Sequence, residues 1–503
     1  MMHKQIMSEG ELFRFFMDQA NLLRGKMESD SYKNFLFPLI FYKFICDTYD
    51  EEYETAFNKT HSEKEAESPR YHKFIIPKDC HWDTIRNASS DIGAVIEKNL
   101  NKIEKANAEV SYDPNGKGIL DGIFGQNIEW SDKNALPDYL LQKVIEKFSA
   151  VDISIKNVGG DALGRAYEYM LGQFAEDAGQ TAQEFFTNRT LVTMMAEILK
   201  IENGDSIYDP TCGTAGMLLM SRKYAEKEGI DLRTLSFYGQ EYNPLSVSIS
   251  RINMMIHDIE DFDIEQGDTI SDPKFKTSES TLQTFNVVMA NPPYSIKDWD
   301  AYSFSRDRFG RNMLGVPKSN ADFVFIQHIL KSMEPETGRA AILLPHGLLS
   351  SKAETELRRE LVKSDLLDCI IGVSKGLFYN SPMEACVFIC RSKKSPDMVG
   401  KTKFIEASKQ FVKNGNHNDL SEENIKFIRD VYFNPKEVDG VSAIVDNESL
   451  LEDPECSLTV DSQLCRLSYP EIYPYSESKK AMIQSRESYH DTFCSIDLKR
   501  GVN

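Results

Sequence analysis

The stretch that decides the fold reads Ser206-Ile-Tyr-Asp-Pro-Thr-Cys-Gly-Thr-Ala-Gly-Met217. Its first three residues predict a short strand, and the apolar spacing of Met217–Glu226 predicts a helix directly after the turn. A glycine turn between a strand and a helix lets backbone N–H groups approach a ligand closely. Because Asp209 would repel a pyrophosphate, this turn suits a cationic or zwitterionic ligand, such as the amino-acid half of S-adenosylmethionine.

The same alternation of short apolar runs and amphipathic helices extends over residues 156–395. It predicts an α/β fold: a doubly wound, Rossmann-like and mostly parallel sheet, in which ligands bind beyond the carboxyl ends of the strands. Further strands are expected at Ser236–Gly239, Phe285–Ala290, Ala340–Leu344, Leu366–Val373 and Ala385–Cys390. Further helices are expected at Thr190–Lys200, Leu245–His257, Asp322–Met333 and Glu354–Lys363.

The regions before and after this alternation have different patterns. Residues 1–155 are expected to form an N-terminal helical domain, because Glu11–Arg24 and Tyr32–Phe57 carry apolar residues at helical spacing. After about Arg391 the pattern weakens, and residues 396–503 form a polar C-terminal segment to which the residues alone assign no chemistry. We therefore expect three parts in the chain.

The composition restricts the class of protein. With 503 residues, 41% of them apolar and 27% charged, the chain is too long for one core and is typical of a globular protein. It has no apolar run long enough to span a bilayer and no signal-peptide pattern, so a cytoplasmic location is expected. The cysteine and histidine spacings predict no metal site, and Cys386 and Cys390 are expected to be buried thiols.

The net charge of −20 bears on possible partners. A protein that binds DNA unaided usually carries a basic surface, because phosphate contacts supply much of the affinity. Either the substrate is not nucleic acid, or a partner supplies most of the phosphate contacts.

Two more acidic residues follow predicted strands. Glu241 in Gly239-Gln-Glu241 ends the strand after the glycine turn, where a carboxylate can accept hydrogen bonds from both hydroxyls of a ribose. Asp268 in Gly267-Asp-Thr269 is placed to contact the adenine amino group of the same cofactor. The order of these acids, rather than any one of them, indicates a nucleoside-containing cofactor.

The most specific motif is Asn291-Pro-Pro-Tyr294, at the end of another predicted strand. Pro292 and Pro293 stiffen the turn and remove two N–H donors, which leaves the Asn291 side-chain oxygen and the Pro292 carbonyl as a rim of acceptors. Two acceptors that grip an amine with a delocalised lone pair can aim that lone pair at a methyl sulfonium. Tyr294 offers a face on which a base turned out of a duplex can stack.

A basic loop with interleaved aromatic residues follows this motif. It contains Lys297, Arg306, Arg308, Arg311 and Lys318, with Trp299 and Phe304 among them. In so acidic a chain the loop is interpreted as an arm that contacts phosphates. The alternative interpretation is a solvated surface loop.

With these motifs, the chain resembles the modification (methyltransferase) subunit of type I restriction–modification systems, a family of N6-adenine DNA methyltransferases. The resemblance extends from about Glu11 to Lys393 and includes Leu22-Leu-Arg-Gly-Lys-Met27, Gly338–Gly347 and Leu377–Met383. Gln183-Glu-Phe-Phe-Thr-Asn-Arg189 resembles the Phe-Thr-Pro-Arg cofactor segment of the family, with Asn188 where proline is usual. Ala215 likewise stands where glycine is common.

The resemblance implies an S-adenosylmethionine-dependent, site-specific DNA adenine-N6 methyltransferase. The implied cofactor-binding residues are Glu184, Phe185, Phe186, Thr187, Asn188, Arg189, Asp209, Gly213, Thr214, Ala215, Gly216, Glu241 and Asp268. The implied catalytic residues are Asn291, Pro292, Pro293 and Tyr294, and the substrate-binding residues are Tyr294, Phe378, Arg306, Arg308 and Arg311. Phe378 would be a second stacking face for the flipped base.

The family also implies partners: double-stranded DNA, a specificity subunit that binds two modification subunits, and a separate restriction subunit. The C-terminal segment would help to dock the partner. Two alternatives stay open at this point. The motif chemistry also suits a glutamine side-chain amide, as in protein glutamine methyltransferases, and the chain could be a non-catalytic, cofactor-binding scaffold subunit of a DNA-defence complex.

Overall fold

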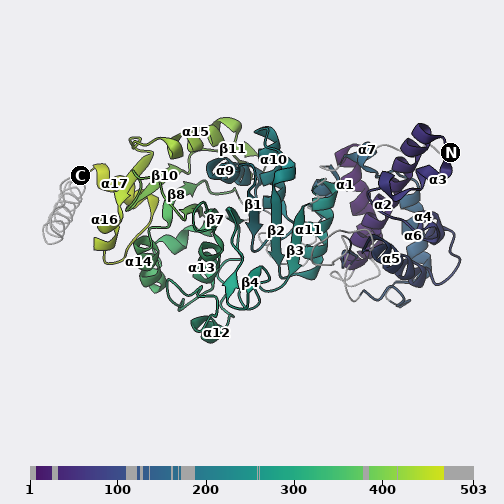
Figure 1. Ribbon diagram of the computed structural model, residues 1–503, viewed down its shortest axis with the longest axis horizontal. Helices are drawn as coiled ribbons and strands as arrows, with labels where there is room; N and C mark the ends of the chain where they lie inside the picture. Colours follow the sequence, from purple (N-terminus) through teal and green to yellow (C-terminus); the bar gives the residue numbers. More distant parts are fainter. Residues whose placement is uncertain are drawn as a thin grey trace, which may run out of the picture.

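The computed structural model describes residues 7–24, 32–108, 120, 122–124, 128–134, 136–159, 162–167, 169–170, 187–257, 259, 261–377, 384–415 and 417–468. The molecule is elongated, with a helical part at one end and a large α/β part in the middle (Figure 1). The helices α16 (Asn447–Glu452) and α17 (Val460–Ser468) lie at the other end (Figure 1).

The N-terminal region is helical, as the apolar spacing predicts. The two long helices expected there are α1 (Glu9–Arg24) and α2 (Tyr32–Thr60), and Leu12, Phe16 and Ile40 on them are fully buried. The shorter elements are α3 (Glu63–Ala66), η1 (Pro69–Tyr71), η2 (Lys78–Cys80), α4 (Trp82–Arg86), α5 (Ile92–Ala108), α6 (Asp138–Ser149) and α7 (Ile155–Val158).

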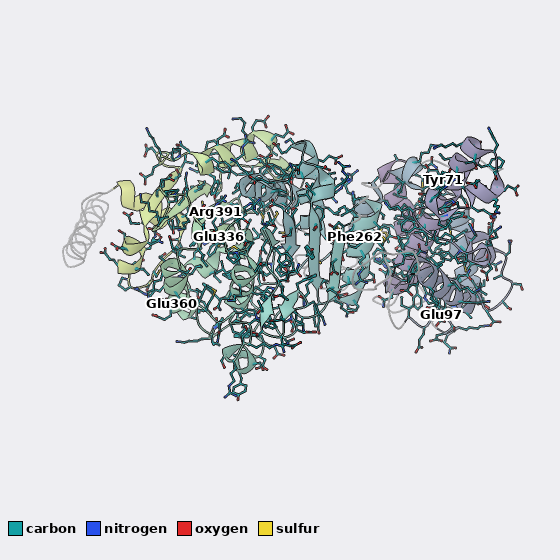
Figure 2. All side chains as sticks on the ribbon, in the orientation of Figure 1. Tyr71, Glu97, Phe262, Glu336, Glu360 and Arg391 are labelled. Carbon is teal, nitrogen blue, oxygen red and sulfur yellow. The ribbon has the colours of Figure 1, made fainter. Side chains whose placement is uncertain are left out.

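The helical part is packed directly on the α/β part. Helix α11 (Pro244–Ile256) contributes Ile249, Ile252 and Met255 to the same apolar cluster as α1 and α2. Phe262, at the side of the α/β part that faces the helices in Figure 2, packs against this cluster and against the sheet core. A shared core makes the position of the N-terminal helices relative to the sheet a consequence of burial.

A nine-stranded sheet in the order β13-β10-β8-β9-β7-β6-β1-β2-β3 forms the centre of the α/β part. The strands are β1 (Ser206–Asp209), β2 (Ser236–Glu241), β3 (Phe262–Gln266), β6 (Val287–Ala290), β7 (Arg339–Pro345), β8 (Leu367–Val373), β9 (Ala385–Arg391), β10 (Lys401–Ala407) and β13 (Ser442–Asp446). The run from β3 to β7 is parallel, whereas β9 is antiparallel to β7 and to β8. Strands β4 (Lys276–Ser278) and β5 (Thr281–Leu282) form a separate small hairpin.

Helices cover both faces of the sheet. One core lies under α9 (Arg189–Leu199), α10 (Gly216–Lys227) and α15 (Glu422–Phe433), and the other lies under α13 (Asp322–Ser332) and α14 (Thr355–Lys363). The remaining short elements are η4 (Leu232–Thr234), α12 (Ala301–Ser305), η5 (His346–Leu349) and η6 (Lys352–Glu354). The doubly wound fold and each strand and helix expected from the sequence are thus confirmed.

The sheet also extends beyond residue 395, where the alternation of the sequence weakens. Strand β10 pairs with β8, and β13 pairs with β10, so residues of the C-terminal segment complete one edge of the sheet. The polar sequence of β10 hides this role because its Lys403 is buried and donates to the carbonyls of Val431, Tyr432 and Asn434 at the end of α15. A lysine with every proton bonded can lie inside a sheet domain without breaking it.

Two expected features of the interior are also present. Cys386 and Cys390 on β9 are fully buried, and burial raises the pKa of the Cys390 thiol to about 12. Both side chains therefore act as small apolar groups in the core, as expected.

Candidate active site

The glycine turn lies at the carboxyl end of β1. Asp209 is buried there, and its carboxylate accepts the Thr211 N–H at 3.0 Å. Gly213 and Ala215 both have positive φ, +53° and +66°, and Ala215 is the N-cap of α10. An L-residue in this region costs about 1–2 kcal/mol, so the turn holds Ala215 in a strained conformation.

Glu241 at the end of β2 holds this turn from the neighbouring strand. One carboxylate oxygen accepts the Gly213 N–H at 3.0 Å, and the other accepts the Asn243 N–H at 2.7 Å. Gly239 permits the approach, because a Cβ there would lie 2.8 Å from the Cys212 Sγ. The sequence therefore brings Asp209 and Glu241 together, as expected from their strand-end positions.

The burial of Asp209 and its proximity to Glu241 change the pKa of Asp209. Burial, with a smaller contribution from the charge of Glu241, raises the pKa of Asp209 to about 7. A ligand cation beside this carboxylate would favour its ionised form and lower that pKa. The turn is thus better suited to a cation than to an anion.

Asp268 lies in the loop after β3, close to the same turn. It is half-buried and accepts the Ile270 N–H at 2.9 Å and the Ser271 hydroxyl at 2.8 Å. The next residue, Thr269, donates its hydroxyl to the Pro210 carbonyl at 2.5 Å. Three consecutive strand ends of the parallel sheet therefore bring their acids to one edge.

The second half of the site is Asn291, directly after β6. Its amide nitrogen donates to the Thr187 hydroxyl at 3.0 Å, and its amide oxygen accepts the Tyr294 hydroxyl at 2.6 Å. Burial raises the pKa of Tyr294 well above its ordinary value, so the phenol stays protonated and a donor. The carboxamide is fixed from both ends, and its oxygen keeps one lone pair for a further donor.

The sequence analysis did not identify Asp322 as part of this site. Its carboxylate accepts the N–H of Ser295, a residue with φ +57°, at 2.7 Å and so fixes the chain where it leaves the Asn291–Tyr294 motif. Burial raises the pKa of Asp322. The signal in the sequence was an acid in the first turn of α13, the second helix after the motif.

The cofactor segment is described only in part. Thr187, Asn188 and Arg189 lead into α9, beside the Asn291 motif. Asn188 is the N-cap of that helix and accepts the N–H groups of Thr190 and Leu191. The remaining expected residues of the segment, and the second expected stacking face, lie outside the described residues: Glu184, Phe185, Phe186 and Phe378.

Arg311 was expected to contact phosphate, and this prediction is wrong. Its side chain is buried, and its guanidinium bonds to Asp307, His328 and the carbonyls of Thr269 and Ile270. These bonds use all five N–H donors, so none remains for a phosphate. Arg311 ties the basic loop to the loop that carries Asp268.

The other basic residues of the loop are exposed. Arg306 lies over the ring of Tyr302 at 4.4 Å, and Arg308 donates to Glu279 at 2.9 Å. Lys297 and Lys318 are exposed as well. The loop thus keeps four cations at its surface around the buried anchor Arg311.

Two kinds of feature are absent from the described part of the chain. Within it, no three side chains of His, Cys, Asp or Glu come together as a metal site would require. No helix among these residues combines the length and the apolar character needed to cross a membrane.

Comparison with known proteins assigns the family. The family model N-6 DNA Methylase matches residues 158–465, and HsdM N-terminal domain matches residues 14–148. The MjaIX methylase subunit of a type I restriction enzyme from Methanocaldococcus jannaschii is 31% identical over 439 residues, which cover 82% of this chain and 75% of that protein. The MpnII methylase subunit from Mycoplasma pneumoniae is 26% identical over 469 residues, covering 86% and 85%.

A solved structure agrees with these matches. The methyltransferase subunit of the type I restriction–modification system from Streptococcus thermophilus superposes with a TM-score of 0.72 at 26% identity, covering 90% of this chain and 99% of that one. The matched ranges contain the helical part, the acidic glycine turn and the Asn291–Tyr294 motif. This chain therefore belongs to the N-6 DNA methylase family, among the methyltransferase subunits of type I restriction–modification systems.

Proposed function

We propose that this DNA methyltransferase transfers the methyl group of S-adenosylmethionine to the exocyclic N6 of adenine in DNA. The observation that carries the proposal is the fixed carboxamide of Asn291, held between Thr187 and Tyr294 at the carboxyl edge of a sheet that also carries the acidic turn. A metal or a side-chain base of high pKa is not required for this chemistry, because the work is done by positioned acceptors.

The acidic turn fits S-adenosylmethionine. The buried carboxylate of Asp209 would take the ammonium of its amino-acid half, and the carboxylate of Glu241, at the end of β2, would take the ribose hydroxyls. Asp268 would accept the adenine amino group, and the backbone of Gly213–Gly216 would line the amino-acid half. When bound, this cofactor supplies a methyl group activated by the neighbouring sulfonium.

The Asn291 motif would act on the target amine. The Asn291 oxygen and the Pro292 carbonyl accept the two N6 hydrogens, which withdraws the nitrogen lone pair from the adenine ring and aims it at the methyl carbon. This lone pair would take the methyl group that the cofactor supplies, with the C–S bond broken as the C–N bond forms, and one N6 proton would be released to water. Tyr294 and Phe378 would stack on the flipped base.

DNA contacts in this proposal fall mainly to other chains. Arg306 and Arg308, with Lys297 and Lys318, would make local phosphate contacts around the flipped base. Against a net charge of −20 these cations are too few for tight binding. We therefore place this subunit in a cytoplasmic complex with a specificity subunit that binds two copies of it, to which a restriction subunit can be added. The C-terminal segment from residue 396 is the proposed docking region.

The first experiment tests the reaction. The purified chain is incubated with its specificity subunit, DNA and methyl-labelled S-adenosylmethionine, and the DNA is digested to nucleosides. N6-methyladenine is the expected product. Label in a glutamine side chain of an added protein would indicate the alternative activity, and absence of transfer with an intact cofactor-binding site would indicate a scaffold subunit.

The second experiment tests the partner. Binding to DNA at physiological salt is titrated with and without the specificity subunit. We expect weak binding without sequence preference by the chain alone and tight, specific binding by the complex. Tight, sequence-specific binding by the purified chain alone would overturn the partner proposal.

A further inference from the structure

Asn188 is the N-cap of α9, and both polar atoms of its side-chain amide are hydrogen-bonded. Its amide oxygen caps α9 by accepting the N–H groups of Thr190 and Leu191 at 2.9 and 3.3 Å. Its amide nitrogen donates to the Asn418 carbonyl at 3.0 Å and to the Asp419 carboxylate at 2.8 Å. The residue is buried, so these bonds are not exchanged for water.

The partners of Asn188 belong to a hairpin in the C-terminal segment, β11 (Val412–Asn414) with β12 (His417–Asp419). Asp419 is itself held, because its second oxygen accepts the Asn414 amide at 2.7 Å. Just after the hairpin, the Leu420 N–H donates to the Thr190 hydroxyl at 2.9 Å. The hairpin is therefore bonded to both the N-cap and the first turn of α9.

The same hairpin holds the loop after β8. The Asn418 N–H donates to the Gly376 carbonyl at 2.7 Å, and its side-chain amide donates to the Lys375 carbonyl at 2.6 Å. Gly376 has φ +76°, and a Cβ there would lie 3.3 Å from the Asn418 amide. This loop leads along the chain to Leu377 and then Phe378, the expected stacking residue.

We propose that the β11–β12 hairpin is a clamp on the active site and that Asn188 and Asp419 are positioning residues for cofactor binding and methyl transfer. The link runs from Asp419 to Asn188, through the backbone to Thr187, and from the Thr187 hydroxyl to the Asn291 amide. Displacing the hairpin shifts Thr187, which orients the carboxamide that grips the target amine. The inference rests on the proposed function and adds a role for the C-terminal segment beyond partner docking.

The test is a charge exchange across the contact, made in the full chain with its specificity subunit. Asn188→Asp keeps the oxygen that caps α9 but turns a second oxygen toward Asp419, which should push the hairpin away. We expect at least a tenfold rise in the Kd for S-adenosylmethionine and at least a tenfold fall in kcat. Asp419→Asn alone should have a small effect. The double variant restores one donor and one acceptor across the contact and should return both values to within threefold of the parent.

A matched control separates positioning from loss of stability. Asn447, at the start of α16, makes the same kind of contact at the far edge of the sheet, since its amide nitrogen donates to Asp365 at 2.9 Å and its oxygen accepts the Thr402 hydroxyl at 2.9 Å. Asn447→Asp should lower the Tm about as much as Asn188→Asp without changing the Kd for the cofactor. Equal loss of affinity in the two variants would overturn the inference.

The remaining outcomes are also distinguishable. If the parent binds and transfers methyl groups while Asn188→Asp does so equally well, or if the double variant shows no recovery, the clamp is refuted and the proposed function stands. If the parent binds no S-adenosylmethionine by calorimetry, the proposed function fails, and the clamp on that site fails with it.

Discussion

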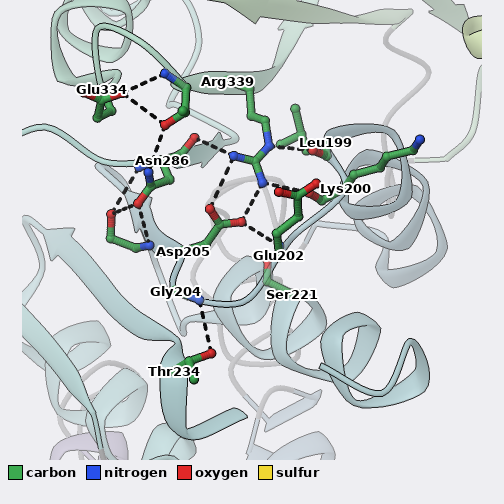
Figure 3. A network of polar contacts seen from close by, with 12 residues as sticks. Leu199, Lys200, Glu202, Gly204, Asp205, Ser221, Thr234, Asn286, Glu334 and Arg339 are labelled. Carbon is green, nitrogen blue, oxygen red and sulfur yellow. Dashed lines mark hydrogen bonds and ion pairs between the residues drawn. The ribbon is translucent and has the colours of Figure 1, made fainter. Parts of the chain in front are cut away.

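The amino and carboxyl ends of the central sheet are built in opposite ways. At the amino end, Arg339 on β7 forms an ion pair with Asp205 and donates to the carbonyls of Leu199, Lys200 and Asn286 (Figure 3). These bonds use all five donors of a buried guanidinium. At the carboxyl end, two acids face each other, and one of them has a pKa of about 7.

From this difference we infer that the amino end serves stability and that the carboxyl end serves the proposed binding. At the amino end the buried charges of Arg339 and Asp205 pair with each other, and no N–H donor of Arg339 is left over for a ligand. The carboxyl end keeps the like charges of Asp209 and Glu241, a strained Ala215 and one lone pair on the amide oxygen of Asn291. Unfavourable features that persist in a stable fold cluster at sites where a ligand relieves them. Substitutions at either end of the sheet test this difference.

The largest expected effect is at Asn291. Asn291→Ala removes the acceptor proposed to act on the target amine alone, so methyl transfer by the complex should fall by about 10³-fold or more. The Kd for S-adenosylmethionine should stay within about twofold of the parent. Single-turnover transfer and calorimetry measure the two quantities. Methylation at the parent rate by this variant would show that the proposed mechanism is wrong.

The opposite end should respond in stability instead. Arg339→Met leaves the buried Asp205 without its partner and should lower the free energy of unfolding by about 3–5 kcal/mol. Because the change is far from the acidic turn, cofactor affinity measured below the unfolding transition should be unchanged. Chemical denaturation and calorimetry check both parts, and a loss of affinity comparable to that of Glu241→Ala would contradict the division of roles.

The sequence predicted the sheet where its strands are apolar and failed where burial is polar. Strand β9, Ala-Cys-Val-Phe-Ile-Cys-Arg, is almost continuously apolar and was predicted nearly to its ends. Strand β3, Phe-Asp-Ile-Glu-Gln, has one fully buried side chain and lies at the sheet edge. Strand β10 begins with the polar residues Lys-Thr-Lys, which do not indicate a buried strand. Its Lys403 can nevertheless be buried, because carbonyl groups about thirty residues further along the chain accept its protons.

The site was predictable to the same degree and for a similar reason. Strand ends of a parallel sheet share one edge, so Asp209, Glu241 and Asn291 could be brought together from their positions in the chain alone. The role of Arg311 could not, because its partners include carbonyls some forty residues earlier. The i,i+4 spacing of Arg311 and Asp307 did indicate from the sequence that the two side chains could form an ion pair. The contact of Asn188 with Asp419 spans 231 residues and has no sequence signal.

Glu241 tests the cofactor half of the carboxyl end. Glu241→Ala removes the acceptor proposed for the ribose hydroxyls and the bond that holds the Gly213 N–H. Affinity for S-adenosylmethionine should fall by ~1.5–3 kcal/mol, the cost of losing charged hydrogen bonds. Calorimetry that finds unchanged affinity in a folded variant would remove Glu241 from the site.

The raised pKa of Asp209 predicts a pH dependence of cofactor binding. In the free protein this acid is half protonated near pH 7, and a bound ammonium would favour its ionised form, so binding releases a proton. Affinity should therefore rise with pH by up to about tenfold per unit below pH 7 and then level off. Asp209→Asn should flatten the profile between pH 5.5 and 7. A parent profile that is flat, or that falls as pH rises in this range, would exclude the ammonium contact.

The smallest expected effects come from two neighbours in the glycine turn that share a left-handed backbone. Gly213→Ala places a methyl in open space at φ +53°, so its cost is the backbone strain alone, about 1 kcal/mol after the lower entropy of the unfolded chain is included. Ala215→Gly relieves the same strain at φ +66° but loses a fully buried methyl, worth about 0.8 kcal/mol, and adds entropy to the unfolded chain. These terms nearly cancel, so the Tm should hardly move for Ala215→Gly and should fall for Gly213→Ala. Equal shifts of the same sign in the Tm of the two variants would show that strain at this turn does not depend on which residue occupies the left-handed position. Backbone strain would then no longer distinguish the carboxyl end of the sheet from the amino end.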